Sequence, residues 1–91
     1  MNPFHAGVYL QELLDGYKIT AYKLAKDTHM PRTRVSEILK GKRGISVDTA
    51  LRLSKYFGNS VQQWLNLQQS YDLYKFHDDT IDEIKPLSEV A

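Results

Sequence analysis

Apolar residues recur at helical spacing in five short segments, most of the glycines fall between these segments, and no proline lies in the interior of one. No run alternates Val, Ile or Thr with polar residues as a β-strand would. The segments are His5–Tyr17, Thr20–Asp27, Pro31–Leu39, Ser46–Phe57 and a last one from Ser60 to about Glu83. This pattern predicts an all-α fold of five helices, the last of them extended.

Residues that favour helix ends mark the limits of these segments. The candidate N-caps, whose side-chain oxygens can accept hydrogen bonds from the free amides of a first turn, are Thr20, Ser46 and Ser60 or Asn59. Pro31 suits a first helical turn, where no amide donor is needed. The predicted stops are Gly16 and Gly58. The residues expected to face the core are Val8, Leu10, Leu13, Leu14, Leu24, Ala25, Val35, Ile38, Leu39, Ala50, Leu51, Leu53 and Phe57.

The chain's length of 91 residues and mass of 10.5 kDa correspond to one domain. We expect this domain to span residues 1–84, with a dimerisation helix over about 60–83 and a flexible tail over 85–91. The chain has no cysteine, which excludes disulfides and thiolate sites. It has no apolar run of membrane-spanning length and no secretory start, so we expect a cytoplasmic protein.

The net charge of +1 hides two oppositely charged regions. From Tyr17 to Tyr56, ten basic residues face three acidic ones, a net charge of +7. From Asp72 to the end, six acidic residues face two lysines, a net charge of −4. A basic middle and an acidic end indicate two different partners, although charges that merely solvate helix faces are the plain alternative.

The segment Pro31–Leu39 carries the chemistry that is easiest to interpret. On a wheel of about 100° per residue, its apolar residues fall on one side and its polar residues on the other. Arginines and short hydroxyls near a helix N-terminus suit the major groove of DNA, because arginine can donate two hydrogen bonds to a guanine edge. The preceding helix is separated only by Thr28–Met30, which is the spacing of a helix-turn-helix.

The stretch from Ile19 to Ile38 resembles the lambda-repressor-like, or XRE, helix-turn-helix family. Ala25 matches the small residue that lets the two helices approach, and Val35 matches a β-branched core residue. Two positions depart from the family. His29 stands where the turn usually has glycine, so a left-handed backbone there would carry a cost. Ala21 stands where a phosphate-binding glutamine is common.

A closer resemblance, to HigA antitoxins, covers His5 to about Ile84. It is carried by Lys-Gly-Lys-Arg-Gly-Ile at 40–45, Trp-Leu-Asn-Leu-Gln at 64–68 and Tyr-Asp-Leu at 71–73. The opening at His5 resembles the family's His-Pro-Gly-Glu, with Ala6 and Val8 as departures. The resemblance implies an antitoxin that represses its own operon, associating with the nucleoid through its operator, and neutralises a HigB-like, RelE-related toxin that cleaves RNA.

Two sets of candidate functional residues follow. The predicted DNA-binding residues are Thr20, Tyr22, Arg32, Thr33, Arg34, Ser36, Lys40, Lys42 and Arg43. Helix capping explains Thr20 equally well. A solvated helix face is the plain alternative for Arg32, Thr33, Arg34 and Ser36, and ordinary solubility is the alternative for Lys40, Lys42 and Arg43. The predicted dimer contacts are Trp64, Leu67, Tyr71 and Tyr74, with packing in the chain's own core as the alternative. A palindromic operator would suit such a homodimer.

Two other classes of function are alternatives to a DNA-binding antitoxin. An enzyme, such as a small ribonuclease, is disfavoured because no catalytic triad order, phosphate-binding glycine loop or paired catalytic carboxylates appear. We expect no cofactor and no metal, since the three histidines are isolated in sequence. A stand-alone regulator without a toxin is the main alternative, and only the HigA resemblance argues against it.

Overall fold

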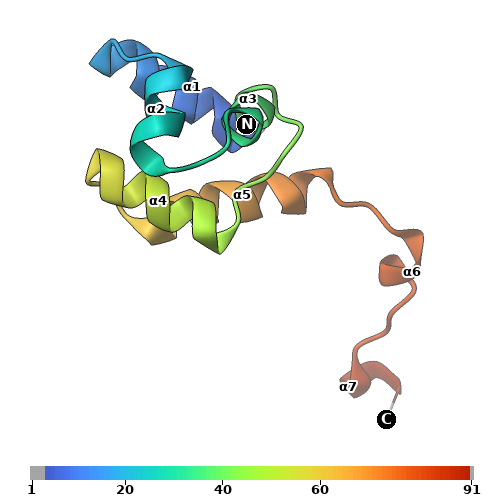
Figure 1. The fold of residues 1–91 in the computed structure, drawn as a ribbon. Coiled ribbons are helices and arrows are strands. Elements are labelled where there is room, and N and C mark those ends of the chain that lie inside the picture. The colour runs from blue at the N-terminus through green and yellow to red at the C-terminus, as the bar shows by residue number, and fades with distance from the viewer. Residues whose placement is uncertain (1–3, 91) are drawn as a thin grey trace.

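The structure is a computed structural model that describes residues 4–90. This part of the chain contains helices and no strand, which confirms the all-α prediction. The helices are α1 (Ala6–Tyr17), α2 (Ala21–Thr28), α3 (Arg32–Leu39), α4 (Val47–Phe57), α5 (Val61–Lys75), α6 (Asp79–Asp82) and α7 (Leu87–Val90). The first five form a compact body, from which the end of α5 leads to the two short helices α6 and α7 (Figure 1).

Capping residues explain where most of these helices begin and end. The side chains of Thr20, Ser46 and Ser60 each accept a hydrogen bond from a backbone amide three residues later, as predicted. Gly58 ends α4 in the left-handed conformation. Gly16 does not end α1, contrary to our prediction. The left-handed residue is Lys18, and the amide of Ile19 then reaches the carbonyl of Leu14, a closure that turns Ile19 back onto the core.

The core is a single cluster at the centre of the five-helix body. Its buried members are Ala6, Leu10, Leu14, Leu24, Ala25, Met30, Val35, Ile38, Ile45, Ala50, Leu53 and Trp64. Leu51 was predicted to be buried but is 52% exposed. On the helical wheel it lies about 160° from Leu53, on the opposite side of α4. The burial of Met30 and Ile45 was not predicted, because both residues lie in connections between helices, where helical periodicity gives no information.

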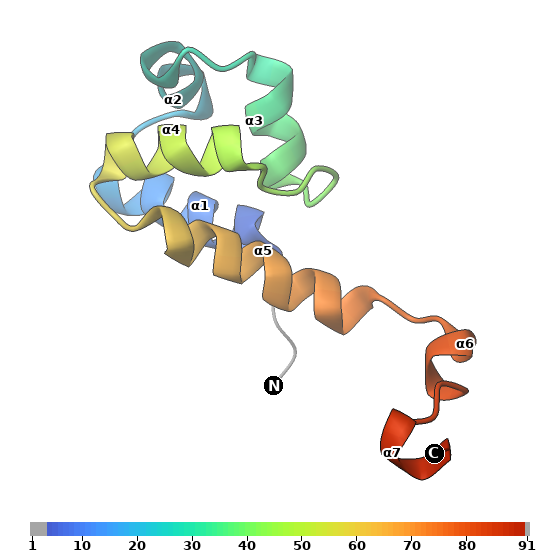
Figure 2. The same cartoon turned by 90° about the horizontal axis from the view of Figure 1, so that it is seen from below.

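The chain after α5 differs from the predicted long helix. The helix ends at Lys75, and Asp78 then caps the new turn α6 by accepting from the amide of Thr80 at 2.9 Å. Every described residue from Asp72 to Glu89 is exposed, so no packing holds this segment in one continuous helix. The arm formed by α6 and α7 gives the molecule a long axis of 57 Å (Figure 2). Within residues 4–90, no helix has both the length and the apolar character needed to cross a membrane.

Candidate nucleic-acid interface

The turn between α2 and α3 joins two helices that pack against each other. His29 occupies it in the left-handed conformation, with φ 57° and ψ 39°, as the departure from glycine led us to expect. Its amide and that of Met30 bond the last carbonyls of α2, and the Met30 side chain is buried. Ala25, 2% exposed, is small enough to lie within the packed core beneath α3.

We expect His29→Gly to raise the free energy of unfolding by about 0.5–1 kcal/mol, because glycine adopts this backbone without the steric cost that other residues meet. The measurement is chemical denaturation of the purified protein. His29→Ala serves as the control, since it keeps a β-carbon and should not stabilise the turn. Equal stability of the glycine and alanine variants would show that the turn is not strained.

The outward side of α3 agrees with the helical wheel. Arg32 and Thr33 are exposed, whereas Val35 and Ile38 are each 1% exposed and face the core. The guanidinium of Arg32 lies over the ring of Tyr22, 4.9 Å from its centre. This contact joins the start of α2 to the start of α3 and holds the arginine in place.

Four of the predicted DNA-binding residues line one hollow on the surface. The hollow has a volume of about 480 Å³, and Tyr22, Arg32, Thr33 and Ser36 line it together with Ala21. Thr20, just before it, caps α2 by accepting from the amide of Lys23 at 3.1 Å. Its hydroxyl proton remains available to donate to a phosphate, so capping and phosphate contact are compatible.

The basic residues after α3 form a loop that leads to α4. Lys40 ends the helix, and Lys42 and Arg43 are exposed. The side chain of Gln68 on α5 accepts from the amide of Ile45 at 2.8 Å, which ties the loop to the body. Arg43 forms an ion pair with Glu37 at 3.0 Å, so part of its charge is already compensated.

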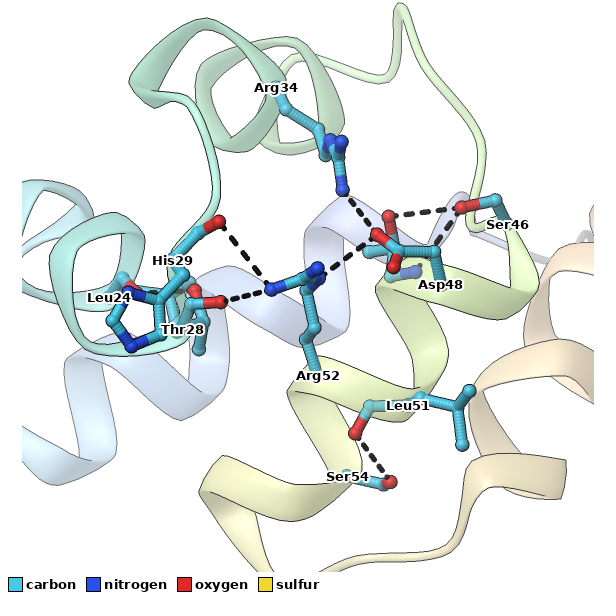
Figure 3. Close-up of polar contacts among 10 residues, drawn as sticks. Leu24, Thr28, His29, Arg34, Ser46, Asp48, Leu51, Arg52 and Ser54 are labelled. Atoms are coloured by element: carbon cyan, nitrogen blue, oxygen red, sulfur yellow. Dashed lines mark hydrogen bonds and ion pairs between the residues drawn. The ribbon is translucent and has the colours of Figure 1, made fainter.

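Arg34 takes a position that the sequence did not predict. Its side chain reaches from α3 to α4, where its Nη1 donates to Asp48 at 2.7 Å (Figure 3). Arg52 donates to the same Asp48 oxygen at 3.0 Å and to the carbonyl of Thr28 at 2.9 Å. Hydrogen bonds from Arg52 and Arg34 hold the pKa of Asp48 below its ordinary value. The spacing of Asp48 and Arg52 along one helix was a sequence signal for half of this network.

The predicted dimer residues separate into two groups. Trp64 is fully buried in the core, and its indole nitrogen donates to the side-chain oxygen of Asn59 at 2.8 Å. It therefore has no surface to offer a second copy, and its assignment as a dimer contact was wrong. Leu67 and Tyr71 are half-buried, and Tyr74 is 53% exposed. Among residues 4–90, no three His, Asp or Glu side chains gather in a way that could hold a metal ion.

Comparison with known proteins places this chain in a family. The model of the helix-turn-helix family matches residues 10–64. Virulence-associated protein I of Dichelobacter nodosus is 44% identical over 97% of this chain and 84% of its own length. An addiction module antidote protein of the HigA family from Coxiella burnetii has a TM-score of 0.83 and 43% identity, over 94% of this chain and 99% of that one.

A further solved structure contains DNA. Pseudomonas aeruginosa antitoxin HigA with the higBA promoter has a TM-score of 0.87 and 38% identity, over 94% of this chain and 99% of that one. The matched region contains α2, the turn, α3 and the loop after it. The chain belongs to the XRE-like helix-turn-helix family, and its structural neighbours are HigA-family antitoxins.

Proposed function

We propose that this protein is an antitoxin that binds the operator of its own operon and neutralises a HigB-like toxin. The observation that carries the DNA-binding part is the outward side of α3, where Arg32 and Thr33 border the hollow shared with Tyr22. The helix-turn-helix turn at His29 precedes α3, and the basic loop that contains Lys42 and Arg43 follows it. A HigA neighbour of nearly equal length was solved with its promoter, which supports the same use of this surface.

The residues divide by the part of DNA that each can reach. Arg32, Arg34, Thr33 and Ser36 lie on the helix that would enter the major groove, so they are assigned to base edges. Lys40, Lys42 and Arg43 follow the helix, and Thr20 and Tyr22 precede it, so they are assigned to phosphates. Phosphate contacts supply affinity for any duplex, whereas base contacts supply preference for one sequence.

This division predicts different outcomes for Arg34→Ala and Lys42→Ala. Loss of Arg34 should cost about 1–3 kcal/mol on the operator and relax preference at one base pair. Loss of Lys42, which is exposed, should weaken operator and random duplexes alike and reduce the dependence of affinity on salt. The measurement is affinity for both duplexes across a salt series. Equal losses on both duplexes for both variants would show that α3 does not read bases.

We also propose that the protein acts as a homodimer on a palindromic operator. Two half-sites about 34 Å apart would double the contacts of one small domain. The exposed side of α5 around Leu67, Tyr71 and Tyr74 is the proposed contact, within a single domain spanning residues 1–84. Sedimentation at micromolar concentration should show a dimer that Tyr74→Glu dissociates. A wild-type protein that sediments only as a monomer would refute the contact.

The toxin is proposed to bind outside α3, so that the complex can still occupy the operator. The exposed segment from Asp72 to Glu89 carries six acidic residues and suits a cationic RNA-binding protein. Glu12 and Asp15, exposed on α1, form the competing acidic surface. We propose a cytoplasmic location for this protein, together with the proposed operon and toxin.

Charge-neutralised full-length variants separate these two surfaces. We expect a variant with amides at Asp78, Asp79, Asp82 and Glu83 to lose at least tenfold in affinity for the toxin while keeping operator affinity. The matched control places amides at Glu12 and Asp15. The measurement is co-purification and titration with the product of the adjacent reading frame, once that frame is shown to encode a small basic protein. A loss of toxin affinity only in the control variant would assign the toxin-binding surface to α1. Operator binding by a protein that binds no toxin would identify a stand-alone regulator.

A further inference from the structure

The network around Asp48 connects three parts of the DNA-binding unit. Asp48, in the first turn of α4, accepts hydrogen bonds at one oxygen from Arg34 of α3 and from Arg52 one turn further along α4. Arg52 in turn donates to the carbonyls of Thr28 and His29, at 2.9 and 3.5 Å, at the end of α2 and in the turn. Figure 3 shows these contacts as one continuous chain of hydrogen bonds.

The Asp48 carboxylate, which contacts α3 from α4, is held more firmly than the Glu37 carboxylate of α3 itself. Glu37 pairs with Arg43, whose side chain lies in the exposed loop after the helix. Asp48 instead shares its oxygen with Arg52, which is anchored to backbone carbonyls of the turn. Anchoring of this kind fixes the position of a carboxylate and so fixes the side chain that donates to it.

The contact leaves one edge of Arg34 for another acceptor. Only Nη1 donates to Asp48, and the Nε–Nη2 edge makes no hydrogen bond with the residues that the structure describes. This edge carries two parallel donors, which is the arrangement that guanine O6 and N7 accept. The Arg34 side chain is 27% exposed, so it is partly enclosed without being removed from the surface.

We propose that Asp48 is a specificity-determining positioning residue, which orients the Arg34 guanidinium so that its free edge meets one base of the operator. The inference rests on the proposed DNA-binding function and assigns Asp48 and Arg52 a role in it. Arg52 acts through Asp48 and is not itself assigned a DNA contact. Orientation before binding reduces the side-chain freedom that a base contact would otherwise have to remove.

The test uses the full-length protein and three kinds of duplex. The first is a duplex that the wild-type protein selects from a randomised pool, the second is a random duplex, and the third is a set of single-base variants of the first. The protein variants are Asp48→Asn, Asp48→Glu, Arg34→Ala and the double variant Asp48→Asn with Arg34→Ala. Glu37→Gln is the matched control, because it removes a negative charge that is paired with Arg43 rather than with Arg34.

We expect Glu37→Gln to change affinity for selected and random duplexes by the same factor. Asp48→Asn should lower the ratio of affinity for the selected duplex to affinity for the random duplex about tenfold. Among the single-base variants, its loss of discrimination should fall at the same base pair as that of Arg34→Ala. The double variant should lose no more than Arg34→Ala alone. Asp48→Glu keeps the charge but displaces it by one methylene, so it should show a partial loss at the same base pair. Melting curves establish that each variant is folded.

Two outcomes would overturn the proposal. One is a ratio for Asp48→Asn equal to that of Glu37→Gln, and the other is an Asp48→Asn effect that persists in full without Arg34. In both cases the wild-type protein still prefers its selected duplex, so the proposed DNA-binding function stands. A wild-type protein that prefers no duplex in the pool would overturn the function and this inference together.

Discussion

Trp64→Ala is expected to lower the free energy of unfolding by about 3–5 kcal/mol. The indole is fully buried at the centre of the core, its ring lies 5.1 Å from that of Tyr9, and its nitrogen donates to Asn59. Truncation would leave a large cavity and an unpaired oxygen on Asn59. Because a small domain is stabilised by only about 5–15 kcal/mol, the variant should be close to unfolding at ordinary temperature.

Far-UV circular dichroism under urea is the suitable measurement, since Trp64 is the single tryptophan and its removal abolishes tryptophan fluorescence. Trp64→Phe should be less costly, because it keeps most of the volume and loses mainly the hydrogen bond. Leu73→Ala is the surface control, because Leu73 is 73% exposed, and its effect should stay within about 0.5 kcal/mol. A Trp64→Ala protein as stable as the Leu73→Ala protein would contradict the packing described here.

Gly7→Ala is expected to destabilise the protein by about 1–3 kcal/mol, although alanine has a higher helix propensity than glycine. A β-carbon at Gly7 would lie 2.0 Å from the backbone carbonyl oxygen of Ile38 and 2.8 Å from the Nδ1 of His5. The clash involves backbone of α3, so the start of α1 and the end of α3 would have to separate. That movement would also disturb the His5 cap, which accepts from the amide of Gly7 at 3.1 Å.

Gly16→Ala is the matched control on the same helix. A β-carbon at Gly16 meets nothing within 4 Å, so the change should stabilise the protein by about 0.5–1 kcal/mol through helix propensity alone. The two substitutions are chemically identical and are expected to have opposite signs. Thermal melts of both variants against the wild-type protein test this expectation, and a stabilising Gly7→Ala would refute the close contact between α1 and α3.

Much of the fold could be predicted because it depends on neighbours in the sequence. Thr20, Ser46 and Ser60 cap helices through amides three residues away, and the wheel of α3 separates Arg32 and Thr33 from the buried Val35 and Ile38. The left-handed backbone at His29 was also expected, since the turn requires it whatever residue stands there. These features are decided within one or two helical turns.

The remaining features depend on how the helices lie against one another, which helical periodicity does not specify. Trp64 and Tyr74 share one apolar pattern, but only the packing of α5 against α1 and α4 buries the first and leaves the second exposed. The partner of Arg34 is Asp48, 14 residues away on α4. The helical wheel of α3 therefore predicted an exposed arginine, whereas the structure shows one that is held by an ion pair. The sequence thus determined the helices, their ends and the basic outward side of α3. The tertiary structure alone decided that Asp48 holds Arg34, that Gly7 admits the carbonyl of Ile38, and that α5 ends at Lys75, one turn beyond the half-buried Tyr71. Each of these features depends on contacts between residues far apart in the chain.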